Sequence, residues 1–358
     1  MNNFRFNFRF NFCCFLLLAS QTIFAQVELN ANGPGDTYEL INSVLAPGYD
    51  VTETPDCIHT SFGRHIDEFF DTNLNTNVFR FYIHLTPDND RCTTATDRQR
   101  NEIKVYDKSP SNLKAVEGEI VVYKWKFKLP TGFQSSSSFT HIHQLKSVGG
   151  LYEATPMYTL TTRKGTPDQL ELRYAQTSSQ STLKKTDLTP FKGTWVDVTE
   201  TITYGTNGSY SILIKRVSDN TELFNYSSSN IVNWQTGADF VRPKWGIYRS
   251  LNTPSDLRDE EVLFANFSIE EIGSLSAISP KQTSFKIYPN PADTSKVTIQ
   301  ASPNSFDSIY IYNNLGKLVN TLISNNTTID TTNLKSGIYL IVFKKNGINV
   351  SSKKLVVL

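Results

Sequence analysis

Basic and tyrosine side chains recur at every second position in several segments of this 358-residue sequence. Successive side chains of a β-strand point to opposite faces of a sheet, so each segment divides into an apolar face and a polar face. The polar faces carry Arg80, Tyr82 and His84; Arg100, Glu102, Lys104 and Tyr106; Lys124, Lys126 and Lys128; His141 and His143; Glu171 and Arg173; and Lys244 and Tyr248.

These polar faces are unusually cationic. Lys and Arg are expected on the outer face of any solvated strand, but such a face normally mixes both charge signs. Of the polar-face residues named above, Glu102 and Glu171 are acidic, and the others are Arg, Lys, His or Tyr. If the segments belong to one sheet, they form a cationic cleft lined with aromatic rings, which suits an anionic polymer. The formal net charge of the chain is only +1, so no general attraction to nucleic acid is expected.

Such a cleft contains the groups needed to cleave a uronic-acid polymer by β-elimination. A cation or hydrogen-bond donor must neutralise the C6 carboxylate, a base must remove the C5 proton, and an acid must protonate the departing O4. Tyr, His and Lys are suitable acids and bases. A lysine base needs a lowered pKa, which neighbouring cations provide. The lysine row at residues 124–128 meets this need if it faces Arg80 and Lys244.

The elements that must position these groups are strands. Turns separate the alternating runs, and no long helical period occurs, which predicts an all-β jelly roll of two stacked sheets over residues 26–272. The expected strands are 78–85, 102–106, 121–129, 139–146, 157–163, 170–174, 195–204, 209–216, 244–248 and 262–269.

The first 25 residues have the pattern of a signal peptide. Arg5 and Arg9 precede a short apolar run, and Ala25 ends a plausible cleavage site. The run is too short to span a bilayer as a mature helix, so no membrane span is expected. In an exported protein, the two cysteines that remain, Cys57 and Cys92, are expected to form a disulfide.

The chain from residue 273 onwards changes in composition. Residues 273–284 are small and polar, as in a linker, and the alternating runs of residues 285–358 predict a small β-sandwich. The Y-P-N-P sequence at 288–291, the N-x-x-G-K sequence at 313–317 and the L-x-x-G-x-Y sequence at 334–339 resemble the C-terminal sorting domain of the type IX secretion system of Bacteroidetes. This resemblance implies export by the type IX machinery, with release or attachment at the cell surface.

Three segments of residues 26–272 resemble, in order, motifs of β-jelly-roll polysaccharide lyases, a group that includes heparin lyase I-like, glucuronan and alginate lyases. They are 98–102, 139–146 and 244–249. The whole region, with segments 34–40, 86–92 and 257–262, is most similar to the ulvan lyases of marine Bacteroidetes. The resemblance implies a secreted enzyme that cleaves a sulfated, uronate-containing algal polysaccharide by β-elimination and leaves 4,5-unsaturated uronate ends.

The resemblance also implies roles for individual residues. Tyr248 corresponds to the catalytic tyrosine that protonates O4. Three residues remain open as the base: Lys126, Lys128 and His143. The expected groups for carboxylate neutralisation are Arg80, His143 and Gln144, and those for other substrate contacts are Arg100, Lys244, Arg249, His141 and Tyr82. Strict alternation puts Gln144 opposite His143, and Arg249 opposite Tyr248, unless a β-bulge intervenes.

Several signals are absent. No E-x-D-x-E strand occurs, which argues against jelly-roll hydrolases with paired carboxylates, and no zinc-type Cys/His spacing is present. His59 and His65 lie in the loop-like N-terminal part and are interpreted as ordinary surface histidines. The proposed chemistry requires no cofactor, although jelly rolls often hold a structural Ca²⁺, whose ligands the sequence does not assign. The alternatives are a lyase for alginate, glucuronan or a heparin-like uronan, and a non-catalytic carbohydrate-binding protein.

Overall fold

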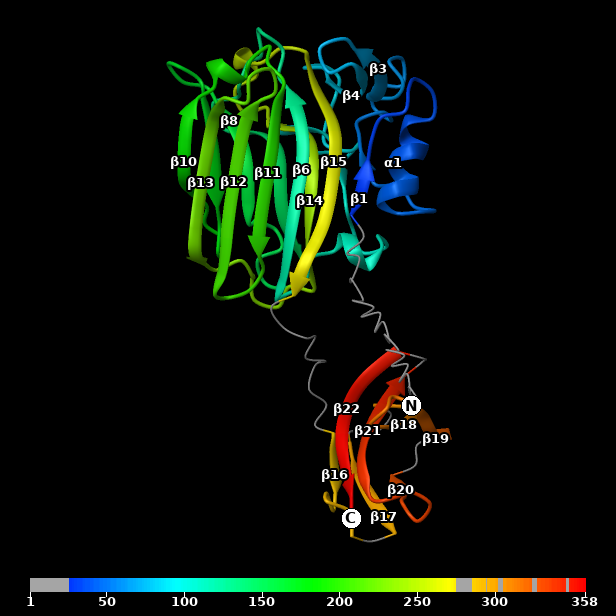
Figure 1. Cartoon of the computed structure of the whole chain (residues 1–358). Helices are drawn as coiled ribbons and strands as arrows, with labels where there is room; N and C mark the ends of the chain where they lie inside the picture. The colour runs from blue at the N-terminus through cyan, green and yellow to red at the C-terminus, as the bar shows by residue number, and fades with distance from the viewer. Residues whose placement is uncertain (1–25, 275–284, 294, 302–304, 324–326, 346–347) are drawn as a thin grey trace, which may run out of the picture. The chain divides into compact units, whose positions relative to one another are not determined.

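The computed structural model describes residues 26–274, 285–293, 295–301, 305–323, 327–345 and 348–358 (Figure 1). The predicted signal peptide, 1–25, and nearly all of the predicted linker, 273–284, lie outside these ranges. The chain divides into two compact units between Leu275 and Ser276. Among the described residues, no helix is long and apolar enough to cross a membrane.

The first unit is a sandwich of two antiparallel sheets, which confirms the predicted all-β fold. The larger sheet faces the viewer in Figure 1. Its strands, in spatial order, are β13 (Glu222–Ile231), β12 (Gly208–Arg216), β11 (Val196–Thr203), β6 (Glu119–Lys128), β15 (Glu260–Ser274), β4 (Thr76–Ile83) and β3 (Ile66–Asp71), with β1 (Val27–Leu29) also paired to β15.

The second sheet brings together strands that are far apart in the sequence. Its strands, in spatial order, are β10 (Ser181–Asp187), β9 (Gln169–Tyr174), β8 (Tyr158–Arg163), β7 (Thr140–Val148), β14 (Phe240–Ser250), β5 (Arg98–Lys104) and β2 (Thr52–Glu53). Strand β14 lies between β7 and β5, so the three lyase-like segments are adjacent in space.

The core of the sandwich lies between the inner faces of the two sheets. Trp125 of β6 and Trp245 of β14 are both fully buried, and their rings meet edge to face with 6.0 Å between the centroids. The apolar faces read from the alternation therefore point inward, as predicted. Their burial removes large apolar surfaces from water, and each Å² of buried apolar surface stabilises the fold by roughly 25 cal/mol.

One short helix, α1 (Thr37–Leu45), lies beside β1 (Figure 1). It buries Ile41 and Leu45, which are one turn apart, and it ends before Pro47, which cannot continue a helix. The sequence analysis missed this helix. The remaining helical turns of this unit are η1 (Ser111–Leu113), η2 (Thr189–Phe191) and η3 (Pro254–Asp256).

The predicted disulfide is confirmed. Cys57 and Cys92 are joined, with 6.0 Å between their Cα atoms, a normal separation for a disulfide. The bridge ties the loop after β2 to the loop that precedes β5, so the long N-terminal segment is fixed to the second sheet.

The second unit is a small sandwich of its own. One sheet contains β16 (Lys286–Tyr288), β17 (Lys296–Gln300) and β20 (Thr328–Asp330), and the other contains β19 (Leu318–Ile323), β18 (Ser308–Asn313), β21 (Gly337–Lys345) and β22 (Ile348–Val357). Phe285 packs against Phe343 in its core, with 4.7 Å between the ring centroids. The N-x-x-G-K motif forms the turn between β18 and β19, where the Asn313 side chain accepts hydrogen bonds from the Leu315 and Lys317 amides.

Candidate active site

The outer face of β5, β7 and β14 brings together five of the eleven predicted site residues. We call this surface the polar face and define it by Arg100 and Glu102 of β5, His141, Gln144 and Lys146 of β7, and Lys244 and Tyr248 of β14.

Tyr248 lies within a group of cations. The guanidinium carbon of Arg100 is 3.6 Å from the centre of the Tyr248 ring, and Arg98 Nη1 donates a 3.0 Å hydrogen bond to the phenol oxygen. Burial raises the pKa of the Tyr248 phenol, although both arginines oppose this effect. The phenol is therefore protonated at neutral pH and can act as a proton donor. Arg98 was not among the predicted site residues.

His141 lies next to Tyr248. The two residues pair in register across β7 and β14, and their ring centroids are 5.7 Å apart. Burial lowers the pKa of the imidazole to about 3, so the ring is neutral at neutral pH. Its Nδ1 is buried and has no hydrogen-bond partner among the described residues. A neutral ring with a free buried nitrogen is thus placed beside the tyrosine.

A β-bulge in β7 determines which side chains share a face with His141. The register with β8 shifts between His141 and His143, because His141 pairs with Thr161 while His143 pairs with Leu160. The extra residue at the bulge reverses the alternation that follows it. Gln144 therefore lies on the polar face, as the sequence analysis allowed if a bulge intervened.

The same bulge turns His143 into the core, so the prediction that it lines the cleft is wrong. Its ring packs against Trp125, with 4.3 Å between centroids. Its Nε2 lies 2.9 Å from Glu200 Oε2, and its Nδ1 lies 3.0 Å from the carbonyl oxygen of Lys244. His143 is fully partnered inside the sandwich and has no access to a substrate on the polar face.

Buried carboxylates neutralise much of the predicted cationic surface. Lys244 Nζ lies 2.7 Å from Glu102 Oε2 and also pairs with Glu53 of the edge strand β2. Arg100 bonds Glu102 at 2.6 Å and Asp90 at 2.7 Å. Burial opposes ionisation of Glu102, but the charges of Lys244 and Arg100 outweigh it and lower the pKa of Glu102 to about 2. This part of the face is therefore an ion-pair network with both charge signs.

Lys146 differs from the other cations of the polar face. It is partly buried, and no hydrogen bond or ion pair involves its ammonium among the described residues. Burial lowers the pKa of Lys146 to about 8, and the charges of Lys244, Arg242 and Arg100 contribute. A useful fraction of this amine is neutral near pH 8. Lys146 lies within the lyase-like segment 139–146, but no role was predicted for it.

Four predicted site residues lie on the other sheet. Arg80 and Tyr82 of β4, and Lys126 and Lys128 of β6, project from the outer face of the eight-stranded sheet. Lys126 bonds Asp197 at 3.0 Å, and Arg80 bonds Asp67 at 2.8 Å. The sandwich core separates them from Tyr248, so the prediction of one continuous cleft is wrong. The period of two sorts side chains by face but does not assign a strand to a sheet.

Arg249 also lies away from the polar face. It is completely buried, its Nε donates to Gln99 Oε1 at 2.9 Å, and its Nη1 donates to the Arg258 carbonyl oxygen at 2.7 Å. The prediction that it contacts substrate is wrong, although its separation from the Tyr248 face follows the alternation. Its role is to orient Gln99.

Comparisons with known proteins identify one part of the chain by its sequence. Residues 286–358 match the model of the family described as "Secretion system C-terminal sorting domain". The protein is therefore exported through type IX secretion. No match was found among the curated proteins.

Solved structures similar to this chain include three polysaccharide lyases. An endo-β-1,4-glucuronan lyase from Trichoderma reesei has 14% identity, with 57% of this chain and 86% of that chain covered, and a TM-score of 0.43. A family 7 alginate lyase, A1-II′, with bound substrate has 16% identity, 65% and 99% coverage, and a TM-score of 0.42. The alginate lyase Aly36B has 10% identity, 70% and 98% coverage, and a TM-score of 0.44. At these identities and scores, function must rest on the residues of this chain.

Proposed function

We propose that this protein is a secreted lyase that cleaves a uronate-containing polysaccharide by β-elimination, with sulfated ulvan as its substrate. The observation that carries the proposal is the pairing of His141 and Tyr248 on one face of adjacent strands. His141 has a neutral ring whose buried Nδ1 has no hydrogen-bond partner among the described residues, and Tyr248 is a protonated tyrosine held by arginines. One can accept a proton and the other can donate one.

In the proposed reaction, the neutral imidazole of His141 removes the C5 proton of the uronate. The electron pair of the broken C5–H bond forms the C4–C5 double bond as the C4–O4 bond breaks. The Tyr248 phenol gives its proton to the departing O4, and proton exchange with solvent restores both groups. A base must be unprotonated before it can act, which holds for His141 at neutral pH because burial lowers its pKa to about 3. A bound uronate carboxylate attracts the proton and raises this pKa in the complex.

The C6 carboxylate must be neutralised because a carbanion forms beside it. Gln144 lies on β7 between His141 and Lys146, and its amide donates one hydrogen bond to Glu102. The second N–H of that amide is available to a substrate carboxylate. We assign neutralisation to Gln144, supported by the positive charge of Arg100.

Lys146 is the competing base, and its pKa of about 8 is closer to the working pH. However, Lys146 pairs with Arg242, six residues from Tyr248 along β14, which is roughly 20 Å at about 3.3 Å per residue. The base and the acid must both reach one sugar ring. We therefore place the base at His141, whose ring centroid is 5.7 Å from that of Tyr248.

A surplus of arginine supports a sulfated substrate. Arg242 beside Lys146 has no carboxylate partner among the described residues. Arg163 of β8 and Arg173 of β9 share one carboxylate, Glu171, at 3.8 and 3.3 Å. The planar guanidinium group binds sulfate and carboxylate oxygens in pairs, so these positions suit the sulfate esters of ulvan.

Incubation with purified polymers tests the proposal. Elimination creates a conjugated double bond, so ultraviolet absorbance is expected to rise with ulvan and to stay lower with alginate, glucuronan and heparin. A larger rise with one of the other polymers would reassign the substrate. Binding to a polymer with no rise for any of them would instead identify a carbohydrate-binding protein.

A further inference from the structure

Three histidines and an aspartate converge outside the polar face. His59 and His65 lie in the loop between β2 and β3. His84 and Asp88 lie in the loop between β4 and β5. One ligand atom from each residue lies within 4.8 Å of all the others. The His65 and Asp88 side chains are fully buried, and those of His59 and His84 are 16% and 18% exposed. The interpretation of His65 as a surface histidine is therefore wrong.

Asp88 is the centre of this cluster. Its Oδ1 lies 2.8 Å from His59 Nδ1 and 3.2 Å from His65 Nε2, and its Oδ2 lies 3.1 Å from His84 Nδ1. The ring of Phe62 covers the group, with 4.3 Å between its centroid and that of His84. Three imidazoles thus face one buried carboxylate beneath an aromatic ring.

The hydrogen bonds of His65 direct its Nε2 to the centre of the cluster. Its Nδ1 lies 2.7 Å from Asp56 Oδ1, and Asp56 Oδ2 in turn accepts a 2.8 Å hydrogen bond from the Tyr38 hydroxyl. A carboxylate accepts hydrogen bonds, so Nδ1 donates a proton to Asp56, and Nε2, 3.2 Å from Asp88, is the ring nitrogen that can hold either a second proton or a metal ion.

We propose that His59, His65, His84 and Asp88 bind one Zn²⁺ ion. Three imidazole nitrogens and one carboxylate oxygen are a suitable donor set for four-coordinate zinc, whereas Ca²⁺ takes six to eight oxygens. Ligand atoms around tetrahedral zinc are about 3.4 Å apart, so small side-chain shifts close the observed cluster onto an ion. All four positions are supplied by the protein, which makes the ion structural.

The surroundings of the cluster are those of a metal site. Ligand histidines commonly donate their second ring nitrogen to a carboxylate, and Asp56 accepts from His65 in this way. The Gln99 amide donates to the carbonyl oxygens of His84 and Asp88 at 2.6 and 2.8 Å. The Asn101 amide donates to the carbonyl oxygen of His65 at 2.8 Å. The segments that carry these ligands are thus held in place by β5.

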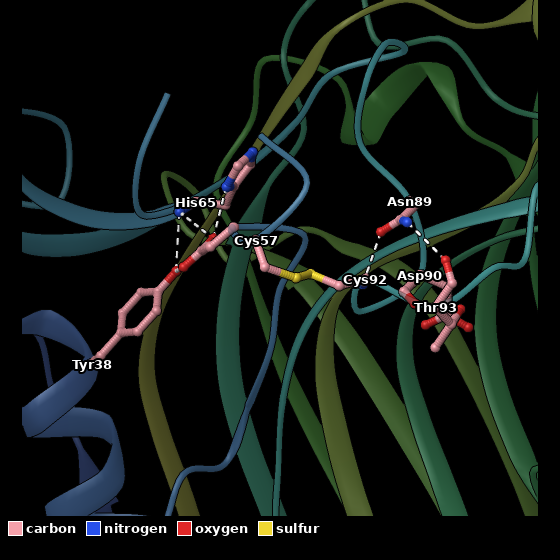
Figure 2. Close-up of a disulfide and its surroundings, with 8 residues drawn as sticks. Tyr38, Cys57, His65, Asn89, Asp90, Cys92 and Thr93 are labelled. Atoms are coloured by element: carbon pink, nitrogen blue, oxygen red, sulfur yellow. Dashed lines mark hydrogen bonds and ion pairs between the residues drawn. A yellow bond between two sulfur atoms is a disulfide. The ribbon is translucent and has the colours of Figure 1, made fainter. Parts of the chain in front are cut away.

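The disulfide restrains the same region. Figure 2 shows the Cys57–Cys92 bridge with Tyr38 and His65 on one side and the segment from Asn89 to Thr93 on the other. Cys57 directly follows Asp56, and Cys92 lies four residues after Asp88. The bridge therefore joins the two loops that the proposed ion also joins.

The proposed zinc site is connected to the polar face through β5. Gln99 and Asn101 hold the ligand segments, while the residues between and beside them, Arg100 and Glu102, belong to the polar face. Asp90, two residues after Asp88, bonds Arg100 at 2.7 Å. Binding of the ion therefore stabilises a loop that helps to orient the arginine stacked on Tyr248.

Metal analysis of the untagged mature protein tests this inference independently of any lyase activity. The protein is stripped with a chelator, dialysed against Zn²⁺ or Ca²⁺, and analysed by elemental mass spectrometry and thermal unfolding. We expect one zinc per chain, a higher Tm with Zn²⁺ than with Ca²⁺, and, after loading with Co²⁺, the visible absorption of a tetrahedral site. Less than a tenth of an equivalent of zinc together with an unchanged Tm would overturn the proposal.

Variants locate the site. His84→Ala removes a partly exposed ligand and is expected to abolish stoichiometric zinc binding, whereas His141→Ala, a histidine outside the cluster, is expected to retain it. Asp56→Asn keeps all four ligands and is expected to weaken zinc affinity about 10- to 100-fold. Because stoichiometry is measured first on the wild type, misfolding of a variant does not remove the test. Equal zinc content in wild type and folded His84→Ala would contradict the assignment.

Discussion

His141 and Gln144 lie on the same face of β7 although they are three positions apart, an odd spacing that a regular strand places on opposite faces. The bulge at Ile142 and His143 supplies the extra residue. It brings the Gln144 amide and the Lys146 amine onto the face that carries Tyr248, and it directs the His143 ring inward to Glu200. The position of Gln144, the proposed neutralising group, depends on this irregularity.

Replacement of His141 tests its role as the base. His141→Ala is expected to lower kcat/KM on ulvan about 10²- to 10⁴-fold, the usual contribution of a positioned general base. Lys126→Ala, on the outer face of the other sheet, is expected to leave activity unchanged. Steady-state rates from the absorbance of the unsaturated product measure both variants. A strong loss in Lys146→Ala with near-normal activity in His141→Ala would transfer the role to the lysine.

Tyr248→Phe removes the proton donor but keeps the ring on which Arg100 stacks. We expect a 10²- to 10⁴-fold loss in kcat with unchanged folding, as judged by circular dichroism. Tyr226→Phe, on β13 of the other sheet, is the matched control and should behave as wild type. Retention of full activity by Tyr248→Phe would exclude the phenol as the acid.

The pH dependence follows from the lowered pKa of His141. A histidine base is active when neutral, so kcat/KM is expected to be level near neutral pH and to fall in acid, as the pH approaches the pKa of about 3. Arg163 is one of the cations that lower this pKa. Arg163→Gln is therefore expected to raise the pKa of His141 and to move the acid limb to higher pH. A shift to lower pH would contradict this electrostatic account.

The buried ion pairs predict a stability effect that is separate from catalysis. Glu102→Gln leaves the Lys244 ammonium buried with Glu53 as its remaining partner, and should lower the free energy of unfolding by about 3 kcal/mol. Urea unfolding measures the loss, with exposed Glu117→Gln as the control. Because the pKa of Glu102 is lowered to about 2, its contribution is present above its unfolded value and is lost as the pH falls towards 2. An unchanged free energy of unfolding at neutral pH would argue against this network.

The sequence predicted the parts of the fold that depend on local pattern. The alternation around Trp125 and Trp245 identified inward faces correctly, because burial imposes a period of two on any strand of a sandwich. The pairing of Cys57 with Cys92 followed from the small number of cysteines. Strand β2, which supplies Glu53, was missed because a two-residue strand is too short to show a period.

The candidate site was predicted only in part, because the pairing of distant strands decides which residues share a face. Alternation could not show that Lys126 and Lys244 belong to different sheets, since each strand has the same local pattern. It also placed His143 on the wrong face, because the register shift in β7 depends on its neighbours β8 and β14. Lys146 and the cluster around Asp88 became visible only when the distant segments were placed together.

Mass spectrometry of the oligosaccharides released from ulvan tests the central proposal most directly. Elimination adds no water across the cleaved bond, so the account predicts products whose non-reducing ends are uronates with a C4–C5 double bond, each one water lighter than a hydrolysis product. Wild-type protein should release them, and Tyr248→Phe should not. Products carrying the mass of an added water, or no release from any uronate polymer, would contradict the assignment of this protein as a lyase.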